Sequence, residues 1–174
     1  MKKILVLLLV YFSFIVGFFL RGYINSDKQV TPTSSPTIIS TQVKFKVTKV
    51  LDGDTIIIET GEKVRYLGID APEPNDAYGI SASKYNEGLV LGKEVKLEYD
   101  YERFDKYGRN LAYVWVDQVL VNEKMVEEGF AKVYTIPGTN KLKYIDRLNT
   151  AQQWAKDHHN GIWLEEWRND IIAP

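Results

Sequence analysis

The sequence contains no cysteine and only two histidines among its 174 residues. The absence of cysteine excludes disulfide bonds, thiolate metal sites and thiol nucleophiles. An excess of positive charge is also missing, because 22 Lys and Arg residues face 23 Asp and Glu residues. Proteins that coat long nucleic acids by bulk charge attraction are usually basic, so this balance counts against that class. It leaves room for a few local arginines that grip one phosphate.

The N-terminus carries one long apolar segment. Residues 4–20 are uncharged and mostly apolar, and they follow Lys2 and Lys3. Such a run is either a signal peptide or a membrane anchor. No clear Ala-x-Ala cleavage site follows it, which favours an uncleaved anchor over residues 1–25. Because more basic residues precede the run than follow it, the sequence predicts a domain on the extracellular face of the cell membrane, or a secreted one if the segment is removed.

A spacer and one folded domain follow. Residues 26–41 are rich in Ser, Thr and Pro and predict a flexible, extended linker. The remaining chain divides into a domain over residues 42–170 and a tail over 171–174. Glu165, Glu166 and Asp170 are interpreted as part of a solvated C-terminal end.

The order of the expected elements indicates the fold class. Alternating apolar residues predict strands over 43–48 and 95–99, and further strands are expected over 55–59, 63–69 and 111–116. Helices are expected over 78–91, 122–126 with Asn122 as a cap, and 141–158. Five strands with a helix between the third and fourth predict an α+β protein built on a five-stranded OB-fold barrel with three helices. An N-terminal hydrophobic helix and the linker precede it.

The central hairpin brings chemistry-bearing residues to one edge. Asp54 opens its first strand and Asp70 closes its second, while Arg65 lies within the second strand and Glu73 follows it. In an antiparallel pair the start of one strand lies beside the end of the next. The carboxylates and the guanidinium are therefore expected to share one small site that suits a hard cation beside a phosphate. Taken singly, each residue also has an ordinary structural reading, such as a turn, a strand ending or a solvated charge.

Several motifs resemble the thermonuclease family, typified by staphylococcal nuclease. They are Asp52-Gly53-Asp54-Thr55, Arg65-Tyr66-Leu67-Gly68-Ile69-Asp70-Ala71-Pro72-Glu73, Asp105-Lys106-Tyr107-Gly108-Arg109, Val121-Asn122, Gly129-Phe130-Ala131-Lys132-Val133 and Gly161-Ile162-Trp163. They occur in family order at near-family spacing, over roughly residues 43–165. Each motif is weak alone, and together they form a strong signal.

The resemblance implies a calcium site and a set of catalytic residues. Asp54, Asp70 and the backbone carbonyl of Ala71 would bind Ca²⁺, with Asp52 behind them. Glu73 would orient or deprotonate the attacking water. Oxygen ligands of this kind suit calcium.

The phosphate-binding residues follow from the same resemblance. Arg65 and Arg109 would bind the scissile phosphate, and planar guanidinium groups suit that task. Lys106 and Tyr107 would contact a neighbouring phosphate, and Tyr134 would lie beside the base.

The implied activity is a calcium-dependent phosphodiesterase. It would cleave DNA, and RNA as well, by in-line attack of water that breaks the bond to the 5′ oxygen and leaves 3′-phosphate ends. Single-stranded substrate is expected to be preferred, and no obligate protein partner is predicted. The alternatives are a membrane-anchored OB-fold module that binds nucleic acid or a protein partner without cutting, and an envelope interaction protein.

Three positions depart from the family pattern. Ala71 stands where the type member has threonine, which matters little for a backbone ligand. The loop over residues 74–77 is shorter than in the type member. Only Tyr134 stands where the type member has two tyrosines, which leaves the base preference open.

Overall fold

The structure is a computed structural model that describes residues 43–135 and 141–172. The predicted hydrophobic helix, the linker and residues 173–174 lie outside the described residues. Within the described ranges, no helix is both long and apolar enough to cross a bilayer.

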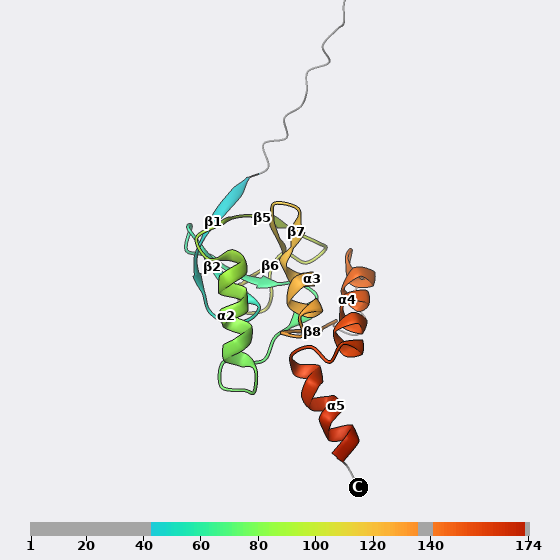
Figure 1. The fold of residues 1–174 in the computed structure, drawn as a ribbon. Helices are drawn as coiled ribbons and strands as arrows, with labels where there is room; N and C mark the ends of the chain where they lie inside the picture. Colours follow the sequence, from blue (N-terminus) through green and yellow to red (C-terminus); the bar gives the residue numbers. More distant parts are fainter. Residues whose placement is uncertain (1–42, 136–140, 173–174) are drawn as a thin grey trace, which may run out of the picture. The chain divides into compact units, whose positions relative to one another are not determined.

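Five strands close into a barrel, which confirms the predicted fold (Figure 1). The main sheet has the order β3-β2-β1-β5-β6-β7, and an additional parallel pairing between β3 and β6 completes the ring. The strands are β1 (Lys44–Val50), β2 (Thr55–Ile58), β3 (Lys63–Tyr66), β5 (Glu94–Glu98), β6 (Asn110–Val116) and the short β7 (Val119–Leu120). Two further short strands, β4 (Ile69–Asp70) and β8 (Lys132–Val133), pair with each other beside the barrel.

Alternation along the strands fills the barrel interior. In β3, Val64 and Tyr66 are buried while Lys63 is exposed and Arg65 is only partly covered. A register shift between Val47 and Lys49 bends β1, so one strand can pair with β2 and β5 in turn. The apolar side chains of every barrel strand therefore meet in one core, and Arg65 is left on the outside of it.

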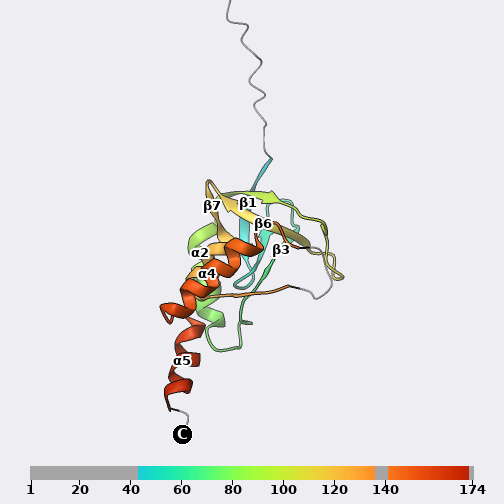
Figure 2. The ribbon, with the colours of Figure 1, turned by 90° about the vertical axis from the view of Figure 1, so that its right-hand side faces the viewer.

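Helices α2 (Gly79–Val90), α3 (Val121–Glu127) and α4 (Ile145–Asp157) pack in that order, α3 touching both neighbours. Figure 1 shows them beside the barrel. The face of α4 that carries Leu148, Ala151 and Ala155 is buried, as its spacing predicts. A further helix, α5 (Ile162–Ile172), follows α4 and leads to the C-terminal end (Figure 2).

Three details differ from the sequence-based expectations. The expected strand over 63–69 is split into β3 and β4, because Gly68 adopts a positive φ of 81° between them. Residues 165–170 belong to the helix α5, which the sequence did not predict, while Glu165 and Glu166 are exposed as expected. Asn122 is not a helix cap but a buried residue of α3 whose side chain accepts from Val114 N–H and donates to the carbonyl of Leu67.

Candidate active site

The turn between β1 and β2 presents the first aspartate. The backbone N–H of Asp54 donates to Asp52 Oδ1 at 2.9 Å, which closes an aspartate turn. Gly53 at its centre has no room for a side chain, since a Cβ there would lie 2.6 Å from the Cβ of Ala71 and 2.9 Å from that of Ala82. Glycine therefore lets the turn pack directly against the segment after β4 and against helix α2.

Asp54 is a buried carboxylate with three partners. Its Oδ1 accepts from Arg65 Nε at 2.9 Å and from the Thr55 hydroxyl at 3.1 Å, and its Oδ2 accepts from the Ala71 N–H at 2.7 Å. Burial raises the pKa of Asp54 above its usual range, while the charge of Arg65 and the Ala71 hydrogen bond oppose that rise. The charge of Arg65 thus favours the ionised form of Asp54 against the effect of burial.

Arg65 links the two predicted metal aspartates. Its Nη2 donates to Asp70 Oδ1 at 2.6 Å, and its Nη1 donates to the carbonyls of Tyr66 and Ile69, both at 2.7 Å. With the Asp54 contact, these bonds account for four of the five N–H groups of a guanidinium. Asp54 and Asp70, which are 16 positions apart in sequence, therefore meet at one side chain.

The donor set at this point fits a hard divalent cation. The two carboxylates gather around one positive group, and the Asp70 side chain is 61 % exposed, so it remains accessible from solvent. Carboxylate and backbone carbonyl oxygens, completed by water, are the ligands that calcium takes. In the part of the chain that the structure describes, no three His, Asp or Glu side chains converge as a metal cluster, so Ala71 and water would have to complete the set.

Glu73 lies three residues beyond Asp70 and outside the aspartate pair. It is exposed and belongs to the loop that leads to α2. Its side chain forms no hydrogen bond or ion pair with any residue in the described ranges. The structure thus brings Asp54, Asp70 and Arg65 together and leaves the exposed Glu73 carboxylate without a hydrogen-bond or ion-pair partner among the described residues.

Arg109 is fixed by Asp105. Its Nε donates to Asp105 Oδ2 at 2.6 Å, while Oδ1 of the same carboxylate accepts from the backbone N–H groups of Tyr107 and Arg109. Burial raises the pKa of Asp105, but the Arg109 and Tyr107 hydrogen bonds outweigh it and the net pKa is lowered. Sequence reasoning missed this role of Asp105, although its spacing of four from Arg109 was a signal.

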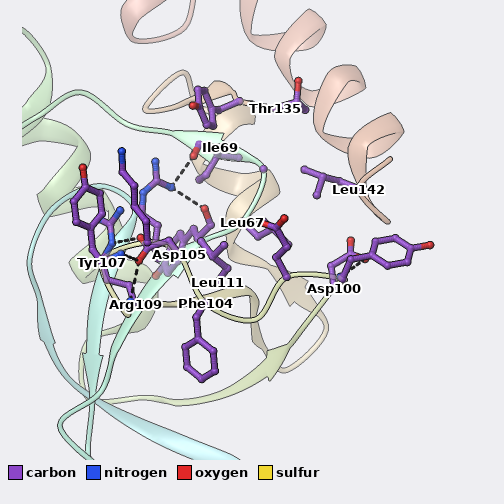
Figure 3. A pocket seen from close by; sticks show the side chains of 17 residues that line it. Leu67, Ile69, Asp100, Phe104, Asp105, Tyr107, Arg109, Leu111, Thr135 and Leu142 are labelled. Atoms are coloured by element: carbon purple, nitrogen blue, oxygen red, sulfur yellow. Dashed lines mark hydrogen bonds and ion pairs between the residues drawn. The ribbon is translucent and has the colours of Figure 1, made fainter. Parts of the chain in front are cut away.

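Both arginines line one pocket of about 460 Å³, called the arginine pocket below. Its walls also include Lys106, Tyr107 and Tyr134. Figure 3 shows Tyr107, Asp105 and Arg109 grouped at one end, with Asp100 and Leu142 at the other. Five of the nine predicted site residues therefore face one cavity.

The position of Tyr134 is set by strand pairing. Its backbone N–H donates to the carbonyl of Gly68 at 3.0 Å, directly after the pairing of Ile69 with Val133. Its side chain is 52 % exposed and that of Tyr107 is 72 % exposed. The two exposed rings thus line a pocket together with three basic and three acidic side chains. The rings and the basic groups suit a base attached to a phosphate.

A buried amide holds the aspartate turn in place. Asn86 on α2 donates from Nδ2 to the Asp52 carbonyl at 3.0 Å and accepts from the Tyr66 hydroxyl at 2.8 Å. Sequence reasoning did not single out Asn86. The available signal was an asparagine four positions from Ala82 and Val90 on the apolar side of a helix.

Comparison with known proteins decides the family. The sequence profile of the family described as staphylococcal nuclease homologue matches residues 63–165. The chain is 36 % identical over 150 residues to a thermonuclease of Staphylococcus intermedius, covering 81 % of this chain and 86 % of that protein. The chain belongs to the staphylococcal nuclease family.

Two further relatives agree with this assignment. A thermonuclease of Staphylococcus hyicus is 38 % identical over 129 residues, covering 68 % of this chain and 75 % of that protein. Endonuclease YncB of Bacillus subtilis (strain 168) is 44 % identical over 131 residues, covering 70 % of this chain and 62 % of the relative. The protein is therefore a nuclease that acts on nucleic acid.

Proposed function

We propose that this nuclease hydrolyses phosphodiester bonds of DNA and RNA in a calcium-dependent reaction at the arginine pocket. The observation that carries the proposal is the meeting of Asp54 and Asp70 at Arg65, which in turn lines the pocket with Arg109. Two acidic groups for a cation and two guanidinium groups for a phosphate thus adjoin one another. This combination suits phosphodiester hydrolysis, because a cation and fixed guanidinium groups stabilise the charge that develops on the phosphate oxygens.

The two arginines bind the phosphate and stabilise charge that develops on it. Arg109 uses Nε for Asp105, and its Nη atoms form no hydrogen bond to the described residues, so they are available to phosphate oxygens. One of the five N–H groups of Arg65 has no hydrogen-bond partner among the described residues. Fixed donors aimed at oxygens that gain charge in the transition state lower the barrier to attack.

Asp54, Asp70 and the carbonyl of Ala71 would hold the calcium ion. When bound, calcium supplies positive charge to the two carboxylates and to a phosphate oxygen. With that charge present, Arg65 would no longer have to compensate both carboxylates, and its Nε and Nη2 donors would be available to phosphate oxygens. Asp54 stays aligned throughout through its hydrogen bond from Ala71 N–H.

Glu73 acts on the attacking water. A carboxylate without a protein partner can accept a proton from water and aim the water oxygen at phosphorus. Attack in line with the 5′ oxygen breaks the phosphorus–oxygen bond to that atom. The phosphate then stays on the 3′ oxygen of the other fragment, so the products carry 3′-phosphate ends.

Single-stranded substrate is preferred because of the two exposed rings. Tyr107 and Tyr134 flank the pocket, and a base can stack on them only when it has left its own helix. Lys106 adds a positive charge on the same wall for a neighbouring phosphate. Frayed or denatured strands therefore meet the site more easily than an intact duplex.

The proposed place of action is the extracellular face of the cell membrane, through residues 4–20, or the medium if that segment is removed. The apolar run behind Lys2 and Lys3 supports this placement. Protease treatment of intact cells tests it. Digestion of the nuclease domain without cell lysis is expected, and complete protection from protease contradicts the proposal.

The activity is tested with the purified full-length protein and denatured DNA. Cleavage is expected with calcium, none with a chelator, and a loss of about 100-fold or more in Arg65→Ala. Lys63→Ala is the matched control, because Lys63 is exposed on the same strand, and its rate is expected to be unchanged. Cleavage that survives both the chelator and Arg65→Ala refutes the proposed site. Binding without cleavage supports the non-catalytic module instead.

The product ends and strand preference are measured in the same assay. Fragments with 3′-phosphate cannot prime DNA synthesis until a phosphatase has removed the phosphate. Extension without phosphatase contradicts the proposed bond cleavage. Equal rates on duplex and denatured DNA contradict the single-strand preference.

A further inference from the structure

The loop between β4 and α2 is tied to itself at Glu73. The backbone N–H of Asp76 donates to the carbonyl of Glu73 at 2.8 Å, and the N–H of Glu73 donates back to Asp76 Oδ2 at 3.3 Å. The N–H of Gly79 donates to the carbonyl of Asp76 at 3.1 Å and continues the turn into α2. Asp76 thus binds the peptide groups on both sides of Glu73 Cα.

Gly79, the first residue of α2, lies directly against the backbone of Glu73. It is buried, and a Cβ there would lie 1.8 Å from the carbonyl oxygen of Glu73 and 3.0 Å from Pro74 Cα. No side chain fits without moving the Glu73 backbone. Glycine at this position lets the first turn of α2 support the peptide group that carries the Glu73 side chain.

The residue before Gly79 has a strained backbone conformation. Tyr78 has a φ of 66°, a left-handed conformation that residues with a Cβ rarely adopt. Its carbonyl already accepts the first helical hydrogen bond, from Ala82 N–H at 2.8 Å. Strain of this kind persists where the surrounding structure fixes the backbone, and it gathers at functional sites.

Together these contacts fix the backbone of Glu73 and leave its carboxylate unpartnered. We propose that Asp76 is a positioning residue for the nuclease reaction, which holds Glu73 in the orientation from which its carboxylate acts on the attacking water. The inference rests on the proposed function, because it assigns Asp76 an effect only through Glu73. Asp76 itself contacts neither the arginine pocket nor the aspartate pair.

Two other roles of Asp76 make different predictions. A residue that only closes a turn would affect folding stability and leave the turnover of the folded protein unchanged. A residue that acts through its negative charge would lose its effect when the charge is removed, even if the hydrogen bond stays. Asn keeps an acceptor oxygen for the Glu73 N–H and removes the charge, whereas Ala removes both.

The experiment measures kcat and KM on denatured DNA with calcium for full-length variants. Asp76→Ala is expected to lower kcat about 10-fold and to change KM less than about twofold. The loss is smaller than the full contribution of a general base, because Glu73 is still present but less well oriented. Asp76→Asn is expected to stay within about threefold of the parent, because it preserves the hydrogen bond. Asn75→Ala is the matched control, since Asn75 is exposed in the same loop and its side chain forms no hydrogen bond to a described residue, and its kcat is expected to be unchanged.

A double variant separates positioning from other effects. In the Glu73→Gln background, Asp76→Ala is expected to change kcat less than about twofold, because there is no base left to position. A further 10-fold loss in that background overturns the proposal. An unchanged kcat in Asp76→Ala, or equal losses in Asp76→Ala and Asp76→Asn, overturns it as well.

Failure of the inference and failure of the proposed function are distinguishable. Full activity in Glu73→Gln alone refutes the base role in the proposed function. A loss in Glu73→Gln without any loss in Asp76→Ala refutes only the positioning role. Thermal unfolding and calcium affinity are measured for each variant, and both are expected to show an intact site. If Asp76→Ala does not unfold cooperatively, Asp76→Ser replaces it and is expected to give a kcat between those of the parent and Glu73→Gln.

Discussion

Replacing Arg65 by methionine tests whether the Arg65 charge stabilises Asp54 and Asp70, with folding stability rather than catalysis as the measured quantity. Methionine keeps the length and the apolar stem of the side chain and removes the charge and the hydrogen bonds. Both Arg65 and Asp54 are mostly covered, with side-chain exposures of 12 % and 7 %. The substitution therefore leaves a buried carboxylate without its cation.

The expected loss of folding stability in Arg65→Met depends on which contact of Arg65 is buried. Removing one partner of a buried pair costs about 3 to 5 kcal/mol, and the lower value applies here because Thr55 and the Ala71 N–H still bond to Asp54. The contact with Asp70 adds at most about 1 kcal/mol, since that carboxylate is largely exposed. At about 3 to 4 °C per kcal/mol for a domain of this size, the midpoint of unfolding falls by about 10 °C.

Calcium is expected to restore part of this loss. A cation at Asp54 and Asp70 supplies the missing charge, and calcium at 100 times its dissociation constant contributes about 2.7 kcal/mol. In the parent protein the gain is smaller, because Arg65 already compensates both carboxylates. The calcium-induced shift of the unfolding midpoint should thus be larger in Arg65→Met than in the parent.

The assay is urea or thermal unfolding of both proteins with calcium and with a chelator. Lys63→Met is the control on the same strand, and its stability is expected to change by less than about 0.5 kcal/mol because Lys63 is exposed. An equal or smaller calcium shift in Arg65→Met refutes the idea that arginine and cation compensate the same carboxylates. So does a stability loss no larger than that of Lys63→Met.

Two further predictions concern the walls of the arginine pocket, and a third concerns Glu98, which is not part of its lining. Asp105→Ala removes the partner that fixes the Arg109 guanidinium and should lower kcat about 10-fold. Asp105→Asn keeps an acceptor for the hydrogen bond and should lower kcat less. Equal losses in the two variants contradict the role of the hydrogen bond. Tyr134→Ala should raise KM for single-stranded DNA about 5- to 100-fold and leave kcat nearly unchanged, because one stacking contact with a base is lost. An unaltered KM shows that no base stacks on Tyr134. Burial raises the pKa of Glu98, but hydrogen bonds from Lys143 and other groups outweigh it, so its folded-state pKa lies below the ordinary 4.5. The stability that Glu98 contributes is therefore complete above pH 4.5 and lost as the pH falls through the folded-state pKa, and Glu98→Gln should flatten acid unfolding in that range.

The barrel was predictable because its signals are local. The apolar run of β2, the alternation of β3 and the Thr60-Gly61 turn between them mark a hairpin without any knowledge of tertiary contacts. The split of the third strand was not predictable in the same way. The run from Lys63 to Ile69 reads as continuous, and only the conformation of Gly68 separates β3 from β4.

The sequence predicted that three of the proposed site residues lie together, but not how they pair. The sequence placed Asp54, Asp70 and Arg65 at one edge, as the structure has them. It did not reveal that Arg65 bridges the two aspartates, because that depends on how one side chain turns. Asp76 was also missed, since its bond to Glu73 depends on a loop conformation that no periodic pattern encodes.

The helix α5 was not predicted for a different reason, although Glu165 and Glu166 are solvent-exposed as expected. Glu165, Glu166 and Asp170 are charged and close to the terminus, which is typical of a solvated tail. In the structure they belong to α5, and Glu166 pairs with Lys132 of β8 at 2.7 Å. A tertiary contact thus joins this segment to the strand beside Asp70, and composition alone could not show it.

Calorimetric titration of calcium into the full-length protein, the parent beside Asp70→Asn, tests the central claim most directly. Asp70 is largely exposed, so its substitution leaves the fold intact and removes one proposed ligand. The account predicts one calcium ion per chain in the parent and binding weakened at least about 10-fold in Asp70→Asn. Equal calcium affinity in the two proteins would contradict it.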